Sequence, residues 1–408
     1  MAATLALVIG ITVLAVLCAL LIASSVLLGE QHKQRAAHAA HGDATELVTV
    51  MRRAEEVRRS VAAAVARRPY TPSMLAAQTH THERSHTFPV DAVFTWVDGT
   101  DDRWRRAVAS ARRAAPATAT TFHISQRDPF VPSRFRRRKN VRDELFYSAQ
   151  LVRAYMPWLR QILIVTQRPH VPWWVEAANA ADAAASDASD TSHRLPRIVV
   201  VHHDEFFGPD AVQPTYNSNV IESQFARLPM LAEHFVSFND DSFVGRPVPR
   251  SMFFTADGAP VLRIREKPAQ CVVGAGNVSW AQHLVNMTMV CGTLGMACGM
   301  PIHQALPLRK SALAKVVDVL SPVLAQLQPL RGAYDFPVVY VAACATPWVA
   351  LPDFVRAGLY RSGDAFASDA AESAPPHLFC INDGFDTPRA HATLSRMMAE
   401  AYHGAAVV

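Results

Sequence analysis

The sequence predicts an α/β protein built on a doubly wound, mostly parallel sheet, with a helical C-terminal portion, preceded by one transmembrane helix and a stem. Short runs of β-branched and aromatic residues alternate with helical stretches, which is the pattern of a parallel sheet covered by helices. Several of these runs are continuously apolar, as in strands that are buried on both faces. Almost every residue from Ala2 to Leu28 is apolar.

The apolar N-terminal segment, residues 1–29, is expected to anchor the protein in a membrane. A helix over Ala2–Leu28 would be ~40 Å long, which exceeds the ~30 Å hydrocarbon layer of a bilayer. A cleaved signal peptide would carry basic residues ahead of a shorter apolar stretch, whereas only Met1 precedes this one. We therefore expect an uncleaved signal anchor, which attaches the protein to the membrane through one N-terminal helix.

The residues themselves leave the orientation of that helix open. Lys33 and Arg35 follow the segment and nothing basic precedes it, so the positive-inside rule places the rest of the chain in the cytosol. Two N-glycosylation sequons begin at Asn277 and Asn286, and these matter only in a lumen.

The rest of the chain divides into three parts. Residues 30–88 are expected to form a stem or linker that is partly helical, because apolar residues recur at helical spacing over 45–68. Residues 89–395 are expected to form the folded domain, interrupted by a low-complexity loop insertion at 176–194. Residues 396–408 are expected to be a C-terminal tail.

The expected elements of the folded domain follow from local patterns. Strands are expected at residues 91–97, 161–166, 197–202 and 235–238. A helix is expected at 145–155, and a mainly helical second half is expected at 292–303 and 311–327.

Composition excludes several classes of protein. Half of the 408 residues are apolar, which excludes wholesale disorder. The formal charge of +5 is only mildly basic, and the arginine-rich run at 134–142 is short and contains a single aromatic residue, Phe135, so nucleic-acid binding is not predicted. The six cysteines include no CxxC pair, which argues against a zinc ribbon or a thioredoxin-type site. Five of them follow the apolar segment, so at most two intrachain disulfides can form there.

Acidic residues follow two of the expected strands. Asp98 and Asp101 follow the first, and Asn239, Asp240 and Asp241 follow the fourth. Open α/β sheets bind ligands beyond the carboxyl ends of their strands, and paired carboxylates suit a hard divalent cation that bridges pyrophosphate oxygens. A turn capped by Asx side chains explains such strings as well, so spacing alone leaves both interpretations open.

Two further features carry functional hypotheses. The arginine-rich run at 134–142 either holds phosphates or is a solvated loop. His303 is a candidate general base, although a lone histidine is more often structural. The residues alone therefore indicate a membrane-anchored α/β protein whose acidic strand ends suit a metal and a phosphorylated ligand.

Taken together and in order, these residues resemble the Stealth family. That family comprises bacterial capsule hexose-phosphate transferases and the catalytic subunits of lysosomal-enzyme N-acetylglucosamine-1-phosphotransferase, and four sequence blocks mark it. The blocks are found at Asp91–Asp101, Arg142–Gly245, His303–Arg309 with Leu330-Arg331 following, and Phe379–Gly384. Where family members commonly have Asp-Asn, this chain has Val141-Arg142, and Phe146 replaces a family arginine. Both departures lie near the expected donor pocket, so they bear on the donor more than on the reaction.

The resemblance implies a Rossmann-like nucleotide-sugar transferase fold and a sugar-1-phosphate transferase activity. The enzyme would move hexose-1-phosphate or N-acetylhexosamine-1-phosphate from UDP-N-acetylglucosamine or GDP-mannose to a sugar hydroxyl, in glycoprotein or phosphoglycan synthesis. Its partners would be the nucleotide sugar and a mannose- or hexose-terminated glycan, and homo-oligomerisation stays open. Anchored eukaryotic members work in the Golgi, which implies a single-pass, type II Golgi membrane protein with a lumenal catalytic domain.

The resemblance also assigns roles to individual residues. Mg²⁺ or Mn²⁺ would bind Asp240 and Asp241, which makes Asp241 catalytic as well as a metal ligand. His303 would take the acceptor's proton, and Arg331 would steady the phosphoryl oxygens. The expected substrate-binding residues are Asp91, Trp96, Asp98, Arg142, Asp143, Glu144, Asn217, Asn239, Asn382 and Asp383.

Two other functions fit the same sequence. A metal-dependent glycosyltransferase would use the same nucleotide sugar, but it would break the anomeric carbon–oxygen bond and release a nucleoside diphosphate. A catalytically inactive relative would bind glycans or serve as a scaffold, and the departures at Val141 and Phe146 are the hint of this alternative.

Overall fold

The structure is a computed structural model of the whole chain. It describes residues 52, 55–56, 58–60, 62–63, 88–114, 144–185, 195–209, 211–262, 264–265, 278–296, 300–301, 305–330, 335–345, 349–350, 357–360, 363–381 and 387–404. The expected membrane helix at 1–29 and most of the expected stem lie outside these residues. Within the described part of the chain, no helix is both long and apolar enough to cross a bilayer.

The central sheet has five strands in the order β3-β2-β1-β4-β9. They are β1 (Val90–Thr95), β2 (Gln161–Thr166), β3 (Arg197–His202), β4 (His234–Asn239) and β9 (Leu306–Arg309). The first four are parallel and β9 is antiparallel to β4. The four strands expected from sequence and the mostly parallel sheet are therefore confirmed.

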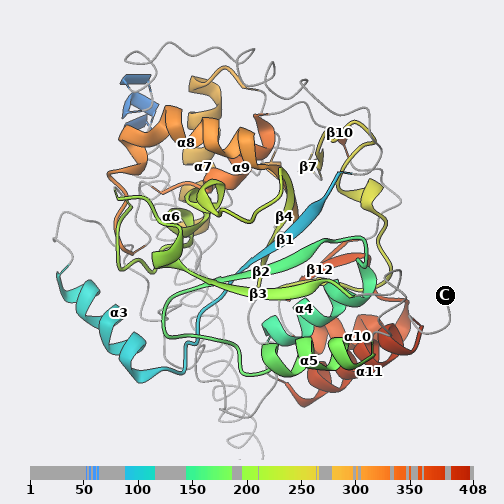
Figure 1. The fold of residues 1–408 in the computed structure, drawn as a ribbon. Helices are drawn as coiled ribbons and strands as arrows, with labels where there is room; N and C mark the ends of the chain where they lie inside the picture. Colours follow the sequence, from blue (N-terminus) through green and yellow to red (C-terminus); the bar gives the residue numbers. More distant parts are fainter. Residues whose placement is uncertain are drawn as a thin grey trace, which may run out of the picture. The chain divides into compact units, whose positions relative to one another are not determined.

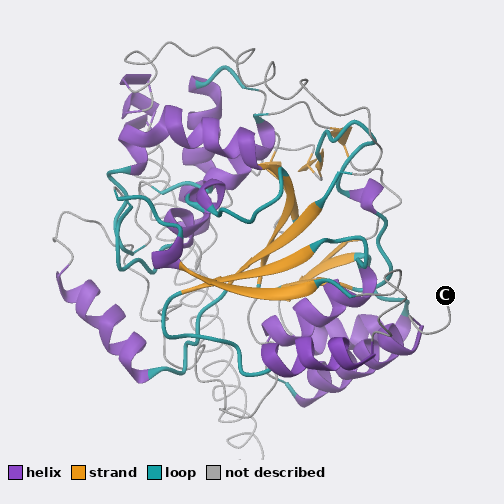
Figure 2. Cartoon of the chain, in the orientation of Figure 1, coloured by secondary structure: helices purple, strands orange, loops and turns teal. Residues whose placement is uncertain are grey.

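Helices cover both faces of this sheet (Figures 1 and 2). The described helices are α3 (Asp102–Ala114), α4 (Glu144–Tyr155), α5 (Val175–Ala185), α6 (Ser218–Ser223), α7 (Val278–Thr293), α8 (Lys310–Leu324), α9 (Val338–Cys344), α10 (Gly363–Glu372) and α11 (Pro388–Gly404). Helices α8 and α9 lie on one side of the sheet in Figure 1, and α4, α5, α10 and α11 lie on the other. The helix expected at 145–155 is α4, and the helix expected at 311–327 is α8.

Short strands complete the fold. Strands β11 (Ala357–Tyr360), β12 (Leu378–Ile381) and β5 (Ser242–Val244) form a second sheet in that order. Two-stranded pairs join β10 (Val349–Ala350) to β6 (Val261–Leu262) and β7 (Ile264–Arg265) to β8 (Met300–Pro301).

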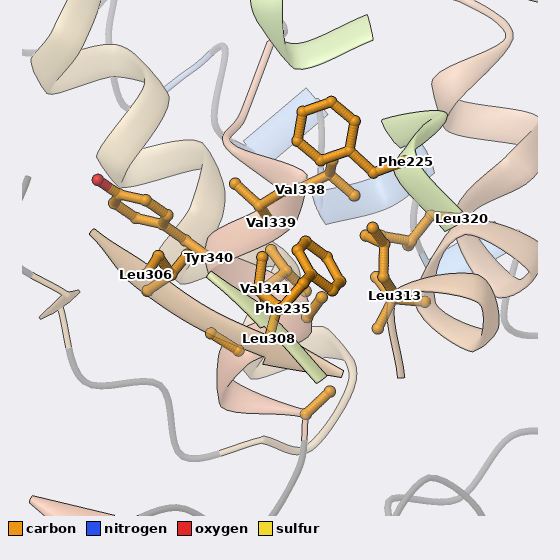
Figure 3. Packing of buried hydrophobic residues seen from close by; sticks show 14 of the residues in the cluster. Phe225, Phe235, Leu306, Leu308, Leu313, Leu320, Val338, Val339, Tyr340 and Val341 are labelled. Carbon is orange, nitrogen blue, oxygen red and sulfur yellow. The ribbon is translucent and has the colours of Figure 1, made fainter. Parts of the chain in front are cut away.

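Alternation along each strand builds two cores, because successive side chains of a strand point to opposite faces of the sheet. On one face, Phe235 packs with the apolar side of α8 and with α9, including Leu313 and Val339 (Figure 3). On the other face, Phe94 and Phe238 stack with their ring centroids 4.9 Å apart, in the same cluster as residues of α4. Apolar residues of α8 recur at the i, i+3, i+4 spacing of an amphipathic helix, which explains its position on the sheet.

The helix expected at 292–303 is wrong: α7 ends at Thr293 and residues 300–301 form β8. Gly295 adopts a left-handed φ of 67°, its N–H donates to the Gly292 carbonyl, and the Met296 N–H donates to the Cys291 carbonyl. This pair of bonds is the Schellman motif, which satisfies the last carbonyls of a helix and stops it.

Two other expected segments contain helix. The first half of the expected loop at 176–194 belongs to α5, whose Asn179 side chain bonds both the N–H and the carbonyl of Ile198 on β3, at 3.1 and 2.9 Å. Helix α11 continues beyond residue 395, where a tail was expected to begin. It continues because its apolar side, which includes Met397 and Ala401, is buried in a cluster with residues of α4.

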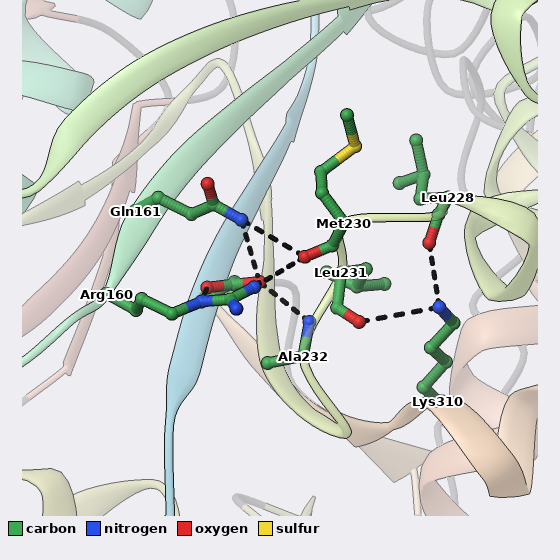
Figure 4. Close-up of polar contacts among 8 residues, drawn as sticks. Arg160, Gln161, Leu228, Met230, Leu231, Ala232 and Lys310 are labelled. Atoms are coloured by element: carbon green, nitrogen blue, oxygen red, sulfur yellow. Dashed lines mark hydrogen bonds and ion pairs between the residues drawn. The ribbon is translucent and has the colours of Figure 1, made fainter.

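One buried carboxylate joins the amino ends of three strands (Figure 4). Asp91, near the start of β1, is completely buried and accepts two bonds from the Arg160 guanidinium, at 2.9 and 2.6 Å. The Ala232 N–H, just before β4, donates to the same carboxylate at 2.7 Å. Arg160 and Gln161 also donate to the Met230 carbonyl. The bonds therefore connect β1 to the residues that precede β2 and β4.

Replacing Asp91 with Asn should lower the free energy of unfolding by about 3 kcal/mol, because Arg160 loses its anionic partner and a buried hydrogen-bond network is broken. Urea denaturation measures this change. Asp102→Asn is the matched control, since the Asp102 side chain is 72% exposed and its ion pair with Arg105 is worth at most about 0.5 kcal/mol. Equal losses in the two variants would contradict the role given to Asp91.

Candidate active site

The strand order of the central sheet reverses at β1. From β1 the chain adds β2 and then β3 on one side, and it returns to place β4 on the other side of β1. Ligands of open α/β sheets bind where the order reverses in this way. Thr95, the last residue of β1, is the register partner of Asn239, the last residue of β4. The expected residues Trp96 and Asp240 therefore follow two neighbouring strand ends.

The acidic pair expected from sequence forms the turn between two sheets. Asp240 and Asp241 connect β4 of the central sheet to β5 of the second sheet. The Asp241 carbonyl accepts a bond from the Ile381 N–H of β12 at 3.1 Å, and β12 pairs with β5 in register. The Ser148 hydroxyl of α4 donates to the Ser242 carbonyl. Three elements thus hold the turn in place.

Carboxylates converge on this turn. Burial raises the pKa of the Cys380 thiol. The charge of Asp241 and its hydrogen bond with the thiol raise this pKa further, and the charges of Glu144 and Asp240 add smaller increases. Burial also raises the pKa of the Tyr340 hydroxyl, followed by the charge of Glu222 and smaller contributions that include Asp241. Groups with pKa values shifted by burial and by specific charged neighbours occur frequently at functional sites.

The donor set fits a hard divalent cation that is shared with a ligand. Among the described residues, no group of three His, Cys, Asp or Glu side chains is arranged to hold a metal ion by itself. Mg²⁺ in phosphoryl-transfer sites is commonly held by one or two carboxylates together with the oxygens of the substrate. Asp240 and Asp241 are two neighbouring carboxylates of this kind.

The loop after β1 is held by hydrogen bonds. The Trp96 N–H donates to the Val165 carbonyl of β2 at 3.0 Å. Asp98 accepts from the N–H and the hydroxyl of Thr100, at 2.9 and 2.6 Å, both through Oδ1. The Asp98 N–H donates to Nδ1 of His170 at 3.2 Å. Asp98 is thus an Asx turn in the structure, which was the alternative interpretation of this acidic string.

Two predicted substrate-binding residues lie elsewhere or serve the fold. Asp91 is near the amino end of β1, at the opposite edge of the sheet from Trp96, Asp98 and Asn239. Asn217 is completely buried as the N-cap of α6, where its side chain accepts from the Asn219 N–H and donates to Asp335 at 2.7 Å. Both side chains are occupied by structural bonds.

Glu144 and Phe146 show how α4 meets the site. Glu144 is the first residue of α4 and is buried, and its charge acts on Cys380 together with the acidic turn. Phe146, at the position where the resemblance implies an arginine, packs edge-to-face on Trp174 with ring centroids 5.4 Å apart.

Six predicted site residues lie outside the described residues. They are Arg142, Asp143, His303, Arg331, Asn382 and Asp383. Their roles stay predictions.

Several residues near the site were not singled out from sequence. Glu222 lies within the second sequence block, but nothing in its neighbours distinguished it from a surface glutamate. Cys380 and Tyr340 belong to apolar stretches and look like ordinary core residues. No local sequence pattern marked His170 as a functional residue, because its partners Asp98 and Asp101 are about 70 positions away in the sequence.

Comparison with known proteins places the chain in a family. Stealth protein CR2, conserved region 2, matches residues 137–262, and Stealth protein CR1, conserved region 1, matches residues 88–114. The chain is 31% identical to the capsular polysaccharide phosphotransferase LcbA of Neisseria meningitidis over 319 residues, which cover 72% of this chain and 78% of that protein. The chain belongs to the Stealth family.

Other Stealth relatives cover the chain to a similar extent. The exopolysaccharide phosphotransferase CpsY of Mycobacterium tuberculosis is 32% identical over 318 residues, which are 74% of this chain and 54% of CpsY. The capsular polysaccharide phosphotransferase fcs1 of Haemophilus influenzae is 29% identical over 317 residues. The chain thus spans about half the length of CpsY. The matched regions contain the first two expected sequence blocks, and the third and fourth stay predictions.

Stability should fall as the pH is lowered, because two buried histidines stay neutral in the folded protein. Burial lowers the pKa of His203, which follows β3, to about 4, with a further contribution from the charge of His202. Burial likewise lowers the pKa of His234 to about 4. The unfolded chain takes up these protons near pH 6.5, so stability present above that pH is lost progressively between about pH 6.5 and 4. Each residue accounts for about 1.4 kcal/mol per pH unit at most.

Chemical denaturation at pH 7 and pH 5 tests this expectation. Between pH 7 and pH 5, the free energy of unfolding of His203→Gln should fall by about 1–2 kcal/mol less than that of the unmodified protein. Identical losses of unfolding free energy in the two proteins would show that His203 does not stay neutral in the folded state.

Proposed function

We propose that this chain is a sugar-1-phosphate transferase that moves a hexose-1-phosphate or N-acetylhexosamine-1-phosphate from a nucleotide sugar to a sugar hydroxyl. The observation that carries the proposal is the convergence of Asp240, Asp241 and Glu144 at the switch point of a doubly wound sheet in a Stealth-family chain. A pyrophosphate-bearing ligand with its cation suits acidic strand ends of this kind.

The chemistry explains why these residue types are needed. The acceptor oxygen forms a bond to the phosphorus that carries the sugar, and the bond from that phosphorus to the nucleoside monophosphate breaks. Asp240 and Asp241 would hold Mg²⁺ or Mn²⁺, and the bound cation would offset negative charge on the pyrophosphate. His303 would accept the hydroxyl proton, and Arg331 would bind the non-bridging oxygens. Trp96, Asp98 and Asn239 would line the donor side.

The relatives support a polysaccharide acceptor. LcbA and fcs1 are named capsular polysaccharide phosphotransferases, and CpsY an exopolysaccharide phosphotransferase. We propose a mannose- or hexose-terminated glycan as the acceptor and UDP-N-acetylglucosamine or GDP-mannose as the donor. The apolar Phe146, in place of a family arginine, is a difference that could select between these donors.

Incubating the protein with each nucleotide sugar, Mg²⁺ or Mn²⁺ and a mannose-terminated acceptor should release a nucleoside monophosphate and leave phosphorus in the product. Asp241→Asn should lower kcat by about 100-fold or more, because the cation loses a charged ligand, and EDTA should abolish turnover. Chromatography of the released nucleotide and ³¹P NMR of the product measure the outcome.

Asp364→Asn, an exposed carboxylate in the first turn of α10, is the matched control and should keep full turnover. Release of a nucleoside diphosphate would instead identify a glycosyltransferase. No turnover of any donor by the folded protein would favour an inactive glycan-binding relative.

We propose the Golgi membrane as the location, with a single-pass, type II anchor at 1–29 and a lumenal catalytic domain. Cys291 is disulfide-bonded, which supports an oxidising compartment. The sequon at Asn286 gives no support, because Asn286 is completely buried and its side-chain amide donates to the Asp335 carbonyl at 2.8 Å. A glycan has no room there.

The orientation can be tested in sealed vesicles. Protease should leave the catalytic domain intact, and an endoglycosidase should change the protein's mobility through a glycan at Asn277. Digestion of the domain together with unchanged mobility would contradict the lumenal placement.

A further inference from the structure

His170, in the loop between β2 and α5, lies at the centre of a hydrogen-bond network. Its side chain is about 5% exposed. Nε2 lies 3.0 Å from Oδ2 of Asp101, and Nδ1 lies 3.2 Å from the backbone nitrogen of Asp98. A backbone N–H can only donate, so Nδ1 is the acceptor and the imidazole proton is on Nε2, where it faces the Asp101 carboxylate. The imidazole thus uses both of its nitrogens on the same turn.

These two bonds hold the turn between β1 and α3 at both ends. Within the turn, the Asp101 N–H donates to the Asp98 carbonyl at 3.2 Å, and the Gly99 N–H donates to the Val97 carbonyl at 3.0 Å. Asp101 also caps α3, because its Oδ1 accepts from the Arg103 N–H at 2.8 Å. The hydrogen bond from His170 lowers the pKa of Asp101, which keeps the cap ionised.

The same loop is tied to the carboxyl end of β3. The His170 carbonyl accepts a bond from Nε2 of His202 at 3.1 Å. The Arg168 guanidinium pairs with Asp204 at 2.9 Å and with Glu205 at 2.7 Å. Since Trp96 donates from the end of β1 to Val165 of β2, the carboxyl ends of three adjacent strands are linked through this loop.

We propose that His170 is a positioning residue that holds the Asp98–Asp101 turn in the shape that binds the nucleotide-sugar donor. This inference rests on the proposed function, which places the donor at this turn. His170 itself is buried, so it acts through Asp98 and Asp101 rather than by touching substrate. Without it, the turn would have to be ordered when the donor binds, and that cost lowers affinity more than it lowers the chemical rate.

Three variants separate the two bonds. His170→Asn keeps an acceptor near the position of Nδ1 for the Asp98 N–H and loses the bond to Asp101. His170→Gln keeps a donor near the position of Nε2 for Asp101 and loses the acceptor for Asp98. His170→Ala loses both. Glu233→Gln is the matched control, because Glu233 bonds Arg309 and Ser311 at the amino end of β4, at the opposite edge of the sheet.

Two measurements are made on the full chain. In the ligand-free protein, hydrogen exchange of the Gly99–Asp101 amides should be about tenfold faster in His170→Ala and unchanged in Glu233→Gln. In steady-state assays with UDP-N-acetylglucosamine or GDP-mannose, KM for the donor should rise about tenfold in His170→Ala, with kcat within about twofold. His170→Asn and His170→Gln should give intermediate values of both quantities, which covers the case in which the alanine variant does not fold.

Unchanged exchange at Gly99–Asp101 in the Asn and Gln variants would overturn the proposal. So would a loss of kcat at constant KM, or a change in KM no larger than that of Glu233→Gln. If the unmodified protein turns over neither donor, the proposed function fails, while the exchange measurement still decides whether His170 holds the turn.

Discussion

The buried carboxylate of Asp91 is the interaction on which the rest of the structure depends. A fully buried charge is tolerated only when charged and polar partners surround it, and those partners come from the residues just before or at the start of β2 and β4. Satisfying Asp91 therefore sets where β2 and β4 begin relative to β1. Since the strands are of equal length, with six residues each, their other ends line up as well. The acidic turn and the loop after β1 become neighbours as a result.

Charged side chains gather at both edges of the sheet. At the amino edge, Asp91 and Glu233 are each paired with an arginine, and Lys310 donates to two backbone carbonyls. These charged groups hold neighbouring segments of the fold together. At the carboxyl edge, Asp240, Asp241 and Glu144 act on one buried thiol with their negative charges combined. These three carboxylates are the ones on which the proposed function rests.

Local patterns account for what the sequence predicted well. Four apolar, β-branched runs became four parallel strands, and their order along the chain was enough to bring Asp98 and Asp240 to one edge. Contacts between distant residues account for what it missed. The resemblance grouped Asp91 with the substrate-binding residues, although the structure buries it at the amino edge, where it is bonded to Arg160. Asn217 reads as a polar site residue until its bond to Asp335, 118 positions away, is seen. The end of α7 depends on the left-handed φ of Gly295. A glycine permits this conformation, but its presence in the sequence does not predict it.

Asn179 and Pro307 have a consequence for the behaviour of the protein in concentrated solution. The central sheet has two outer strands, β3 and β9, and an outer strand with open backbone groups invites a strand from another molecule. On β3, the Asn179 amide already occupies the N–H and the carbonyl of Ile198, as a neighbouring strand would. On β9, Pro307 has no N–H to offer. An alanine-rich segment and a single proline thus discourage this sheet from growing into an intermolecular β-aggregate.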